Sequence, residues 1–466
     1  MKLFKSCHFL LIITIFFIQI KKNVIHSKII FVFEHARHGT RTPPFNEDST
    51  YIDQYGTKWE GNGELTPIGK RINYVLGIQN RIKYSSLLDF SKFNPKEIQI
   101  FSTNSVRTLK SLEAELHAMY LPGTGDTLSE EELLIAYPPD KENLSPEVIK
   151  EIENMDNSTI INKINLFPIQ FYPEGKVFLN EPDHCPYMTK YRLELEKRAN
   201  ATLTQFMKDF DQKYGDKLRD YLKRPNKDFI YSYGSLIDIT DNYICNYDNG
   251  KNLSDFLNFT GFDKEEFHKA SIEVKMFYLF HLSSDQKAGL IGSTPHMTDL
   301  INYMEKKVKN ENNITYSEPK MVIQGGHDTT LNVIQFFMEK AFNIPLQYVK
   351  FGANIYFELH KDDNDNTKYF VKYFYDGKLL LEKDYNEFKQ KVLETVLSEK
   401  EINDFCFQDE KKEKDNTNFL TILILIITNI IYGLTTGIFV FLFCYSKKKS
   451  ASELSSGNIN NDRLVD

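Results

Sequence analysis

Arginine, histidine and glycine stand together in one short segment of this chain. Residues 37–43 read Arg-His-Gly-Thr-Arg-Thr-Pro and follow an apolar run at 29–33. Arginine presents a planar fork of N–H donors that matches phosphate oxygens, and histidine is a nucleophile at moderate pH. Glycine lets the backbone approach a ligand closely. The segment is therefore suited to hold a phosphoryl group and to attack it.

Two later segments carry further reactive residues just after an apolar run. Arg107 follows the run 98–101, and His327 and Asp328 follow the run 321–323 and two glycines. In an open parallel sheet, ligands bind at the carboxyl ends of the strands. We therefore expect one composite site of three guanidinium groups, two imidazoles and a carboxyl group, made by Arg37, His38, Arg41, Arg107, His327 and Asp328.

This set of residues predicts phosphoryl transfer through a covalent phosphohistidine. The guanidinium groups would stabilise charge on the phosphoryl oxygens, and they would disfavour a proton on His38, which leaves a ring nitrogen free to attack phosphorus. Asp328 is the expected proton donor to the leaving alkoxide, provided that a bound dianion and an acidic compartment keep it protonated. His327 would donate to the phosphoryl oxygens. Water then completes the reaction, and the chemistry requires no metal or cofactor.

The surrounding elements predict an α/β fold with a mostly parallel sheet flanked by helices. Thr66 and Pro67 are a good N-cap and first residue for a helix, a strand is expected at 98–101, and a second helix at about 105–120. Further strands are expected at 355–359 and at 369–375, the latter at a sheet edge. The apolar positions of the first helix are Ile68, Ile72, Val75, Leu76 and Ile82.

The chain is expected to divide into a catalytic core in two parts and an inserted cap. The core parts are 28–128 and 314–410. The region 129–313 has scattered prolines and helical stretches such as 188–211 and 264–281, which predicts a mainly helical cap between them.

Both ends of the chain predict membrane targeting. Residues 1–27 read as a signal peptide, with cleavage after Ser27 as the expected site. Residues 419–445 are apolar and long enough to cross a bilayer, and a polar stalk at 411–418 precedes them. Because three lysines follow at 447–449, the tail 446–466 should face the cytoplasm and the body the lumen or the exterior. This is a single-pass type I topology.

Composition and cysteine usage fit a secreted body. The net charge of −7 argues against nucleic acid as a partner, and a homodimer stays open. Cys185, Cys245 and Cys406 lie in the body, so an oxidising compartment favours one disulfide and one free thiol, and the spacing suits no metal site. Six glycosylation acceptors lie in the body: Asn143, Asn157, Asn200, Asn252, Asn258 and Asn313.

The motifs resemble those of the histidine acid phosphatases, relatives of the phosphoglycerate mutases. Arg-His-Gly-x-Arg-x-Pro with a distant His-Asp pair is the pattern of that family. Gly-Glu-Leu-Thr-Pro-Ile-Gly at 63–69, Ser-Thr-Asn-Ser-Val-Arg-Thr at 102–108 and His-Cys-Pro at 184–186 resemble further family segments in the same order, and His-Asp-Thr-Thr at 327–330 matches the acid phosphatase branch. The resemblance covers about residues 28–406, and the membrane span makes the chain look most like the lysosomal and membrane-bound members.

The resemblance implies a phosphoglycerate mutase-like core that hydrolyses small phosphate monoesters at acidic pH without a cofactor. It implies His38 as nucleophile, Asp328 as proton donor, and Arg37, Arg41, Arg107 and His327 as phosphate ligands. It also implies a Cys185–Cys406 disulfide, in a lysosome-like compartment or at the cell surface. The chain departs from the family in lacking the usual partner of a cysteine near Cys245, which leaves open whether Cys245 is free. Two alternatives stay open: a phosphatase of inositol phosphates or a phosphotransferase, and a surface receptor or adhesion ectodomain that lost catalysis.

Overall fold

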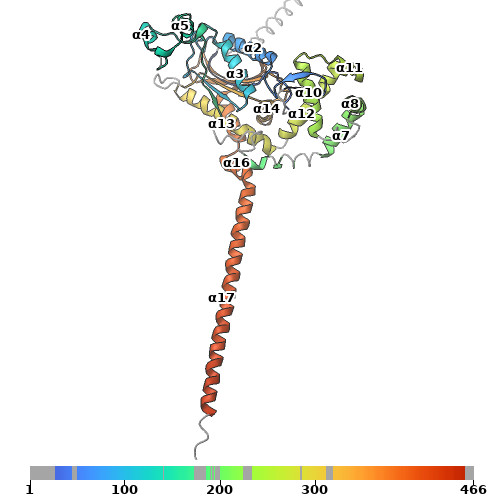
Figure 1. The fold of residues 1–466 in the computed structure, drawn as a ribbon, viewed down its shortest axis with the longest axis vertical. Helices are drawn as coiled ribbons and strands as arrows, with labels where there is room; N and C mark the ends of the chain where they lie inside the picture. Colours follow the sequence, from blue (N-terminus) through green and yellow to red (C-terminus); the bar gives the residue numbers. More distant parts are fainter. Residues whose placement is uncertain are drawn as a thin grey trace, which may run out of the picture. The chain divides into compact units, whose positions relative to one another are not determined.

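The computed structural model describes residues 27–44, 50–139, 141–172, 185–188, 190–191, 194, 200–223, 233–283, 286–310 and 318–456. The chain divides into two compact units, Met1–Glu399 and Lys400–Asp466, which are described in turn (Figure 1). The expected signal peptide lies outside the described residues except for Ser27, the first residue of strand β1.

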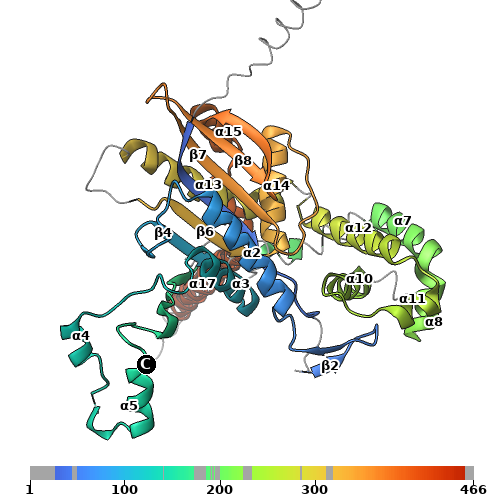
Figure 2. The same cartoon turned by 90° about the horizontal axis from the view of Figure 1, so that it is seen from above.

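A seven-stranded sheet forms the centre of the first unit (Figure 2). In spatial order its strands are β5 (Ile169–Phe171), β4 (Ile98–Ser102), β6 (Met321–Gly326), β1 (Ser27–Arg37), β7 (Asn354–Asp362), β8 (Tyr369–Tyr375) and β9 (Lys378–Asp384). β5, β4, β6 and β1 pair in parallel, and β7, β8 and β9 continue the sheet in antiparallel pairs. The predicted α/β fold with a mostly parallel central sheet is confirmed.

The prediction of an edge strand at 369–375 is wrong, because β9 covers β8 on its outer side. The two strands are joined at Asp376 and Gly377, whose φ angles of 44° and 75° are both positive. Tight hairpin turns that match the twist of a sheet require positive φ at both central residues, and Asp-Gly is a preferred pair there. The Asp-Gly pair in the sequence was therefore the signal for β9.

Both faces of the sheet are covered, as the alternating side chains of β1 show. Val32 packs with the cluster beneath helices α2 (Pro67–Lys83) and α3 (Val106–Met119). Phe31 and Phe33 pack on the other face, in the cluster that includes residues of α13 (Gln286–Asn310), α14 (Asp328–Phe342) and α15 (Tyr385–Thr395). A strand buried on both faces has apolar residues at successive positions, which is the pattern that the run 29–33 has.

Helix α2 forms where it was predicted, but its buried face is not the apolar one. Thr66 accepts a hydrogen bond from the N–H of Gly69 as the expected N-cap, yet Val75 and Ile82 are exposed. The residues that α2 buries are mostly small or amide-bearing, namely Gly69, Asn73, Leu76, Gly77 and Asn80. A Cβ atom on Gly77 would collide with the carbonyl oxygen of Glu115 on α3. Close packing of the two helices therefore selects glycine over bulk at this contact.

The region 129–313, expected to be a mainly helical cap, is helical but also contributes to the core. Strand β5 pairs with β4, and α13 packs in the core cluster. Five helices gather beside the sheet, away from the short helices α4 (Glu130–Ile135) and α5 (Pro146–Glu153) (Figure 2). They are α7 (Asn200–Phe210), α8 (Asp216–Leu222), α10 (Tyr233–Asp248), α11 (Ser254–Thr260) and α12 (Lys264–Ser283). An aromatic cluster that includes Tyr243, Phe256 and Phe267 holds them together.

The remaining elements are short. A hairpin of β2 (Thr50–Ile52) and β3 (Lys58–Glu60) precedes α2, and three further turns of helix lie at Lys141–Asn143, Ile161–Lys163 and Asp211–Gly215.

The second unit contains the long helix α17 (Gln408–Ser456), preceded by α16 (Glu399–Cys406). The stretch Thr421–Lys449 of α17 has a mean hydropathy of 2.1 and no burial, so it is long and apolar enough to cross a membrane. It overlaps the predicted span at 419–445. The residues expected to form a stalk, 411–418, continue the same helix.

Candidate active site

The three predicted segments meet at the carboxyl ends of β1, β4 and β6. The N–H of His38, after β1, donates to the carbonyl oxygen of Gly326 at 3.1 Å. The N–H of Thr103, after β4, donates to the carbonyl oxygen of Gly325 at 3.3 Å. The two glycines that end β6 thus tie both neighbouring loops together, and α3 and α14 begin directly beyond. The structure brings all six predicted residues into one cluster.

Arg37 is fully buried and held on three sides. Its Nη1 donates to the carbonyl oxygen of Val349 at 2.7 Å, and its Nη2 donates to Asp328 Oδ2 at 2.8 Å. The guanidinium carbon lies 4.0 Å from the centre of the Phe351 ring. An arginine fixed in this way can present its remaining N–H groups to an anion without losing side-chain freedom on binding.

His38 has one ring nitrogen fixed and the other available. Nδ1 lies 2.8 Å from the carbonyl oxygen of Gly39. A carbonyl oxygen can only accept, so Nδ1 carries the proton and Nε2 of the neutral ring has a lone pair. Burial, and then the charge of Arg37, hold the pKa of His38 well below its ordinary value. The ring therefore stays neutral, and nucleophilic at Nε2, in acidic solution.

The segment 63–69 supports the loop that carries His38. The backbone N–H of Thr66 donates to the carbonyl oxygen of Thr40 at 3.0 Å, and its hydroxyl donates to the same oxygen at 3.1 Å. A Cβ atom on Gly39 would collide with the carbonyl oxygen of Gly69. The two glycines therefore let the loop and the start of α2 touch through their backbones. The motif at 63–69 therefore supports the loop that carries His38.

Arg107 and His327 lie side by side across the site from Arg37. Arg107 Nη2 is 3.4 Å from His327 Nδ1, and Thr103 Oγ1 is 3.0 Å from His327 Nε2. Because arginine has no acceptor, Nδ1 accepts and Nε2 carries the ring proton. Burial and the charge of Arg107 lower the pKa of His327 to about 3, so its ring is neutral. Burial, followed by the charge of Arg41, lowers the pKa of Arg107 to about 10.

Two charged residues that the sequence did not single out complete the cluster. Asp241 on α10 accepts from Arg41 Nη2 at 2.9 Å and pairs through its other oxygen with Lys275 Nζ at 2.6 Å. Lys275 on α12 also lies 2.9 Å from Asp328 Oδ2. Both are buried. Each has another charged residue close by in its helix, Asp238 and Glu273 respectively, so the sequence alone does not mark either one as buried.

The carboxyl group of Asp328 is held as an anion by its neighbours. Its Oδ1 accepts from the N–H of Thr329 at 2.9 Å, and its Oδ2 faces Arg37 and Lys275. Burial opposes the charge, but Arg37 and Lys275 outweigh burial and hold the pKa of Asp328 well below its ordinary value. Its position in the first turn of α14 favours the anion further.

The site as a whole is cationic. Three arginines and a lysine face two carboxylates, Asp241 and Asp328, and the two imidazoles are neutral. A buried excess of positive charge with free N–H donors fits an anion such as phosphate. Among the described residues, no group of three or more His, Cys, Asp or Glu side chains could hold a metal ion.

The remaining predicted residues lie outside this cluster, apart from Cys245. Its thiol is 3.3 Å from Arg41 Nη1, and burial raises its pKa to about 12. Cys185 and Cys406 are both disulfide-bonded. Of the expected glycosylation acceptors, Asn143, Asn252 and Asn258 are exposed, Asn157 is half-buried, Asn200 begins α7, and Asn313 is outside the described residues.

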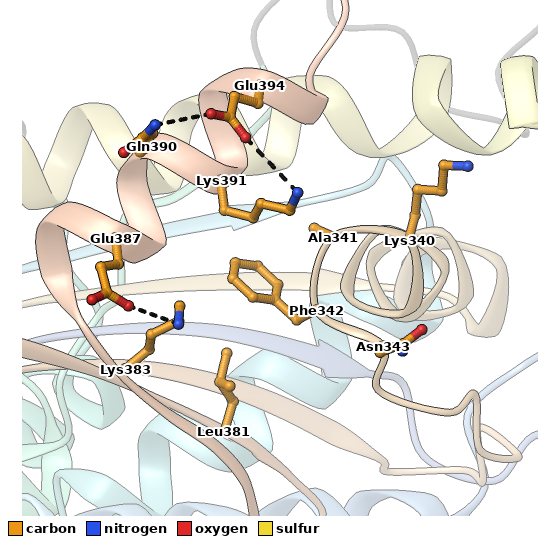
Figure 3. Close-up of a pocket in the computed structure, with 10 residues that line it drawn as sticks. All are labelled: Lys340, Ala341, Phe342, Asn343, Leu381, Lys383, Glu387, Gln390, Lys391 and Glu394. Carbon is orange, nitrogen blue, oxygen red and sulfur yellow. Dashed lines mark hydrogen bonds and ion pairs between the residues drawn. The ribbon is translucent and has the colours of Figure 1, made fainter.

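A separate hollow of about 690 Å³ lies between the end of α14, β9 and α15 (Figure 3). Phe342 and Leu381 point into it, and its charged groups pair locally, Lys383 with Glu387 at 2.8 Å and Lys391 with Glu394 at 3.8 Å. Its lining shares no residue with the cationic cluster. Local pairing of its charges makes it a poorer anion site than the cluster around His38.

Solved structures share the fold over most of the chain. The apo form of the Hafnia alvei phytase aligns with a TM-score of 0.52 and 13% identity, over 80% of this chain and 97% of that one. The phytase of Citrobacter braakii aligns with a TM-score of 0.50 and 14% identity, over 81% of this chain and 99% of that one.

Sequence comparison identifies the family. The lysosomal acid phosphatase of Xenopus laevis is 36% identical over 92 residues, which are 20% of this chain and 21% of that protein, so the match spans about a fifth of each. The model of the histidine phosphatase superfamily (branch 2) matches residues 20–376 and therefore includes the cluster from Arg37 to Asp328. With that match across most of its length, the chain belongs to branch 2 of the histidine phosphatase superfamily.

Proposed function

We propose that this protein hydrolyses small phosphate monoesters in acidic solution through a phosphohistidine on His38. Its family implies a phosphatase. The observation that carries the finer proposal is the state of the His38 ring, which is buried among three arginines with Nδ1 bonded to the carbonyl oxygen of Gly39. That arrangement keeps Nε2 unprotonated at a pH where a free histidine would be charged.

In the first step, Nε2 of His38 attacks phosphorus while Arg37, Arg41 and Arg107 bind the phosphoryl oxygens. The P–N bond forms and the P–O bond to the alcohol breaks. Positive groups fixed before substrate arrives stabilise the charge of the transition state without reorganising. The neutral His327 adds one N–H donor if it exchanges Thr103 for a phosphoryl oxygen.

The leaving alkoxide takes a proton from Asp328, which must first acquire one. Before substrate binds, the cations around it hold Asp328 as an anion. A bound phosphate group offsets these cations with its own negative charge, which raises the proton affinity of the carboxyl group. In the second step a water molecule gives a proton to Asp328 and attacks phosphorus, the P–N bond breaks, and phosphate leaves.

We place the reaction on the lumenal or outer side of a membrane. The apolar stretch Thr421–Lys449 would anchor the chain as a single-pass type I protein. The exposed acceptors Asn143, Asn252 and Asn258 would then be available for glycosylation. A lysosome-like compartment would supply the acidic pH.

The test uses the purified full-length protein and its His38→Ala variant. We expect wild-type turnover of p-nitrophenyl phosphate and glycerol phosphate between about pH 4 and 6, and no turnover by the variant at an unchanged circular dichroism spectrum. A quench without acid should trap labelled phosphohistidine in the wild type alone. Turnover by His38→Ala would remove His38 from the mechanism. A wild type without activity would favour a receptor or adhesion role, and a strong preference for phytate would favour an inositol-phosphate phosphatase.

A further inference from the structure

Lys275 enters the proposed reaction only as a charge beside Asp328, and the motifs do not account for it. It projects from the middle of α12 and is 7% exposed, although lysine is almost never buried unless it is paired. Its Nζ lies 2.6 Å from Asp241 Oδ1 and 2.9 Å from Asp328 Oδ2. The ammonium group therefore joins two carboxylates from α10 and α14.

Asp241 keeps the ammonium group of Lys275 at this position. Its Oδ2 accepts from Arg41, so that Arg41, Asp241, Lys275, Asp328 and Arg37 form one chain of alternating charges. Each group in the chain is buried or nearly so. Such a network leaves Lys275 few alternative positions, and truncating it would leave two buried carboxylates short of a partner.

Three donors face the carboxylate of Asp328, and two of them are cations on the same oxygen. Oδ1 accepts from the N–H of Thr329, and Oδ2 lies 2.8 Å from Arg37 Nη2 and 2.9 Å from Lys275 Nζ. The other ionisable groups near it are the cations Arg41 and Arg107, the neutral rings of His38 and His327, and Asp241 across the lysine. The buried phenol of Tyr348, whose pKa burial raises, is neutral beside them. A proton on Oδ2 would have to displace one of two cations.

The geometry points to Lys275 as a positioning residue that acts through Asp328: it keeps the carboxyl group deprotonated until a phosphate group binds and offsets its charge. Proton donation is then available only in the occupied site. This inference rests on the proposed function of Asp328 as proton donor. It also assigns a role to a residue outside the sequence motifs.

Removing Lys275 should raise the pKa of Asp328, because the carboxylate would then face one cation in place of two. A single opposite charge within about 4–6 Å lowers the pKa of a carboxyl group by about 1–3 units. Without Lys275, Arg37 alone would hold the anion. Asp328 would then keep its proton to a higher pH, and the enzyme would remain competent as an acid over a wider pH range.

The test compares two esters across pH with the full-length protein. For glycerol phosphate, whose alkoxide needs a proton, we expect Lys275→Met to move the basic limb of kcat/KM upward by about one pH unit or more. For p-nitrophenyl phosphate, whose leaving group needs little help, the limb should stay in place. Lys275→Arg keeps the charge and should restore the wild-type profile. Lys269→Met, an exposed position on the same helix, is the matched control.

A second readout needs no turnover. Sulfate is a dianion that does not titrate in this range. Protons taken up when sulfate binds must therefore go to groups of the protein. Calorimetry in buffers of different ionisation enthalpy measures this uptake. We expect the wild type to take up protons when sulfate binds and Lys275→Met to take up fewer. In Asp328→Asn the share that the carboxyl group of Asp328 takes up should be absent. If Lys275→Met does not fold, Lys275→Gln gives the same comparison, because glutamine can still bond to both carboxylates.

The outcomes separate the two proposals. An inactive wild type or an active His38→Ala variant would defeat the proposed function. If those results hold as expected, equal shifts for both esters in Lys275→Met would reduce Lys275 to a structural ion pair and overturn the inference. Unchanged profiles together with unchanged proton uptake would overturn it too.

Discussion

At the scale of single residues, the reactivity of the site depends on which atoms carry protons. The carbonyl oxygen of Gly39 fixes the proton of His38 on Nδ1, and Arg107 leaves the proton of His327 on Nε2. A backbone carbonyl does not titrate and Arg107 stays charged in mildly acidic solution, so neither assignment changes there. The one group whose proton state must change during the proposed reaction is Asp328.

Replacing Asp328 with Asn tests that change. Asparagine keeps the shape of the side chain but cannot supply an acidic proton. We expect kcat/KM for glycerol phosphate to fall by about 10²-fold or more, and kcat/KM for p-nitrophenyl phosphate to fall far less. Asp363→Asn, an exposed position, serves as control. Equal losses on the two esters would exclude proton donation as the role of Asp328.

Residues that belong to a local motif were predictable, and residues supplied by the cap were not. Arg37, His38 and Arg41 share one heptapeptide, and His327 and Asp328 share another motif, so their types and neighbours indicated their chemistry. Asp241 and Lys275 come from helices whose sequences give no hint of which strand end they will face. Their partners are set by how α10 and α12 pack against the core, which is a property of the tertiary structure.

At the scale of elements, the predicted strands 98–101 and 321–323 both end at the site, because parallel strands place their carboxyl ends at one edge. The face of α2 was harder to predict. Hydrophobic periodicity assumes that bulk is buried, whereas α2 approaches its neighbours through Gly69 and Gly77. Close backbone contact, rather than apolar area, decides which side of this helix faces inward.

A pair of glycine substitutions separates support of the site from support of the fold. In Gly39→Ala the new methyl group meets the backbone of Gly69, and we expect the loop with His38 to move and activity per folded molecule to fall at least tenfold. In Gly77→Ala the clash is with Glu115 on α3, away from the cationic cluster. Overpacking of this kind costs about 1–3 kcal/mol of stability, and activity per folded molecule should persist.

Thermal unfolding and kcat/KM, measured on both glycine variants, check this expectation. Comparable loss of specific activity in the two variants would mean that the α2–α3 contact also controls the site. Full activity in Gly39→Ala would mean that the loop tolerates the displacement and that the motif at 63–69 has another reason.

At the scale of the whole molecule, the core of the fold contains a pair of buried glutamates. Glu34 on β1 and Glu115 on α3 are fully buried. The Nδ2 of Asn80 donates to Glu34 Oε2 at 3.0 Å and to Glu115 Oε1 at 2.8 Å. Tyr356 in turn donates to the Oδ1 of Asn80 at 2.7 Å. Two carboxyl groups bridged by one amide are stable in a core only if protons neutralise them.

This pair makes the stability of the fold depend on pH. Burial raises the pKa of Glu34 from 4.5 to about 7, and burial together with the neighbouring Glu34 raises the pKa of Glu115. Above pH 4.5 the folded pair holds protons that the unfolded chain releases, so the contribution of this pair to stability is greatest below the ordinary glutamate pKa and falls as pH rises through 7. His38 and His327, whose folded pKa values are lowered, contribute in the opposite direction below their ordinary pKa of about 6.5. For Glu34 alone the loss is on the order of 3 kcal/mol.

We therefore expect the unfolding temperature of the full-length protein to fall as the pH rises from about 6.5 to 8, where the histidines of the unfolded chain have lost their protons, and Glu115→Gln to remove much of that slope. Glutamine keeps the hydrogen bond to Asn80 but has no proton to lose. Glu113→Gln, exposed on the same helix, should leave the slope unchanged. A flat profile in the wild type, or equal slopes in the two variants, would contradict this account. Buried acids that stay protonated below pH 7 and a His38 ring that stays neutral there would both suit the acidic compartment proposed for the reaction.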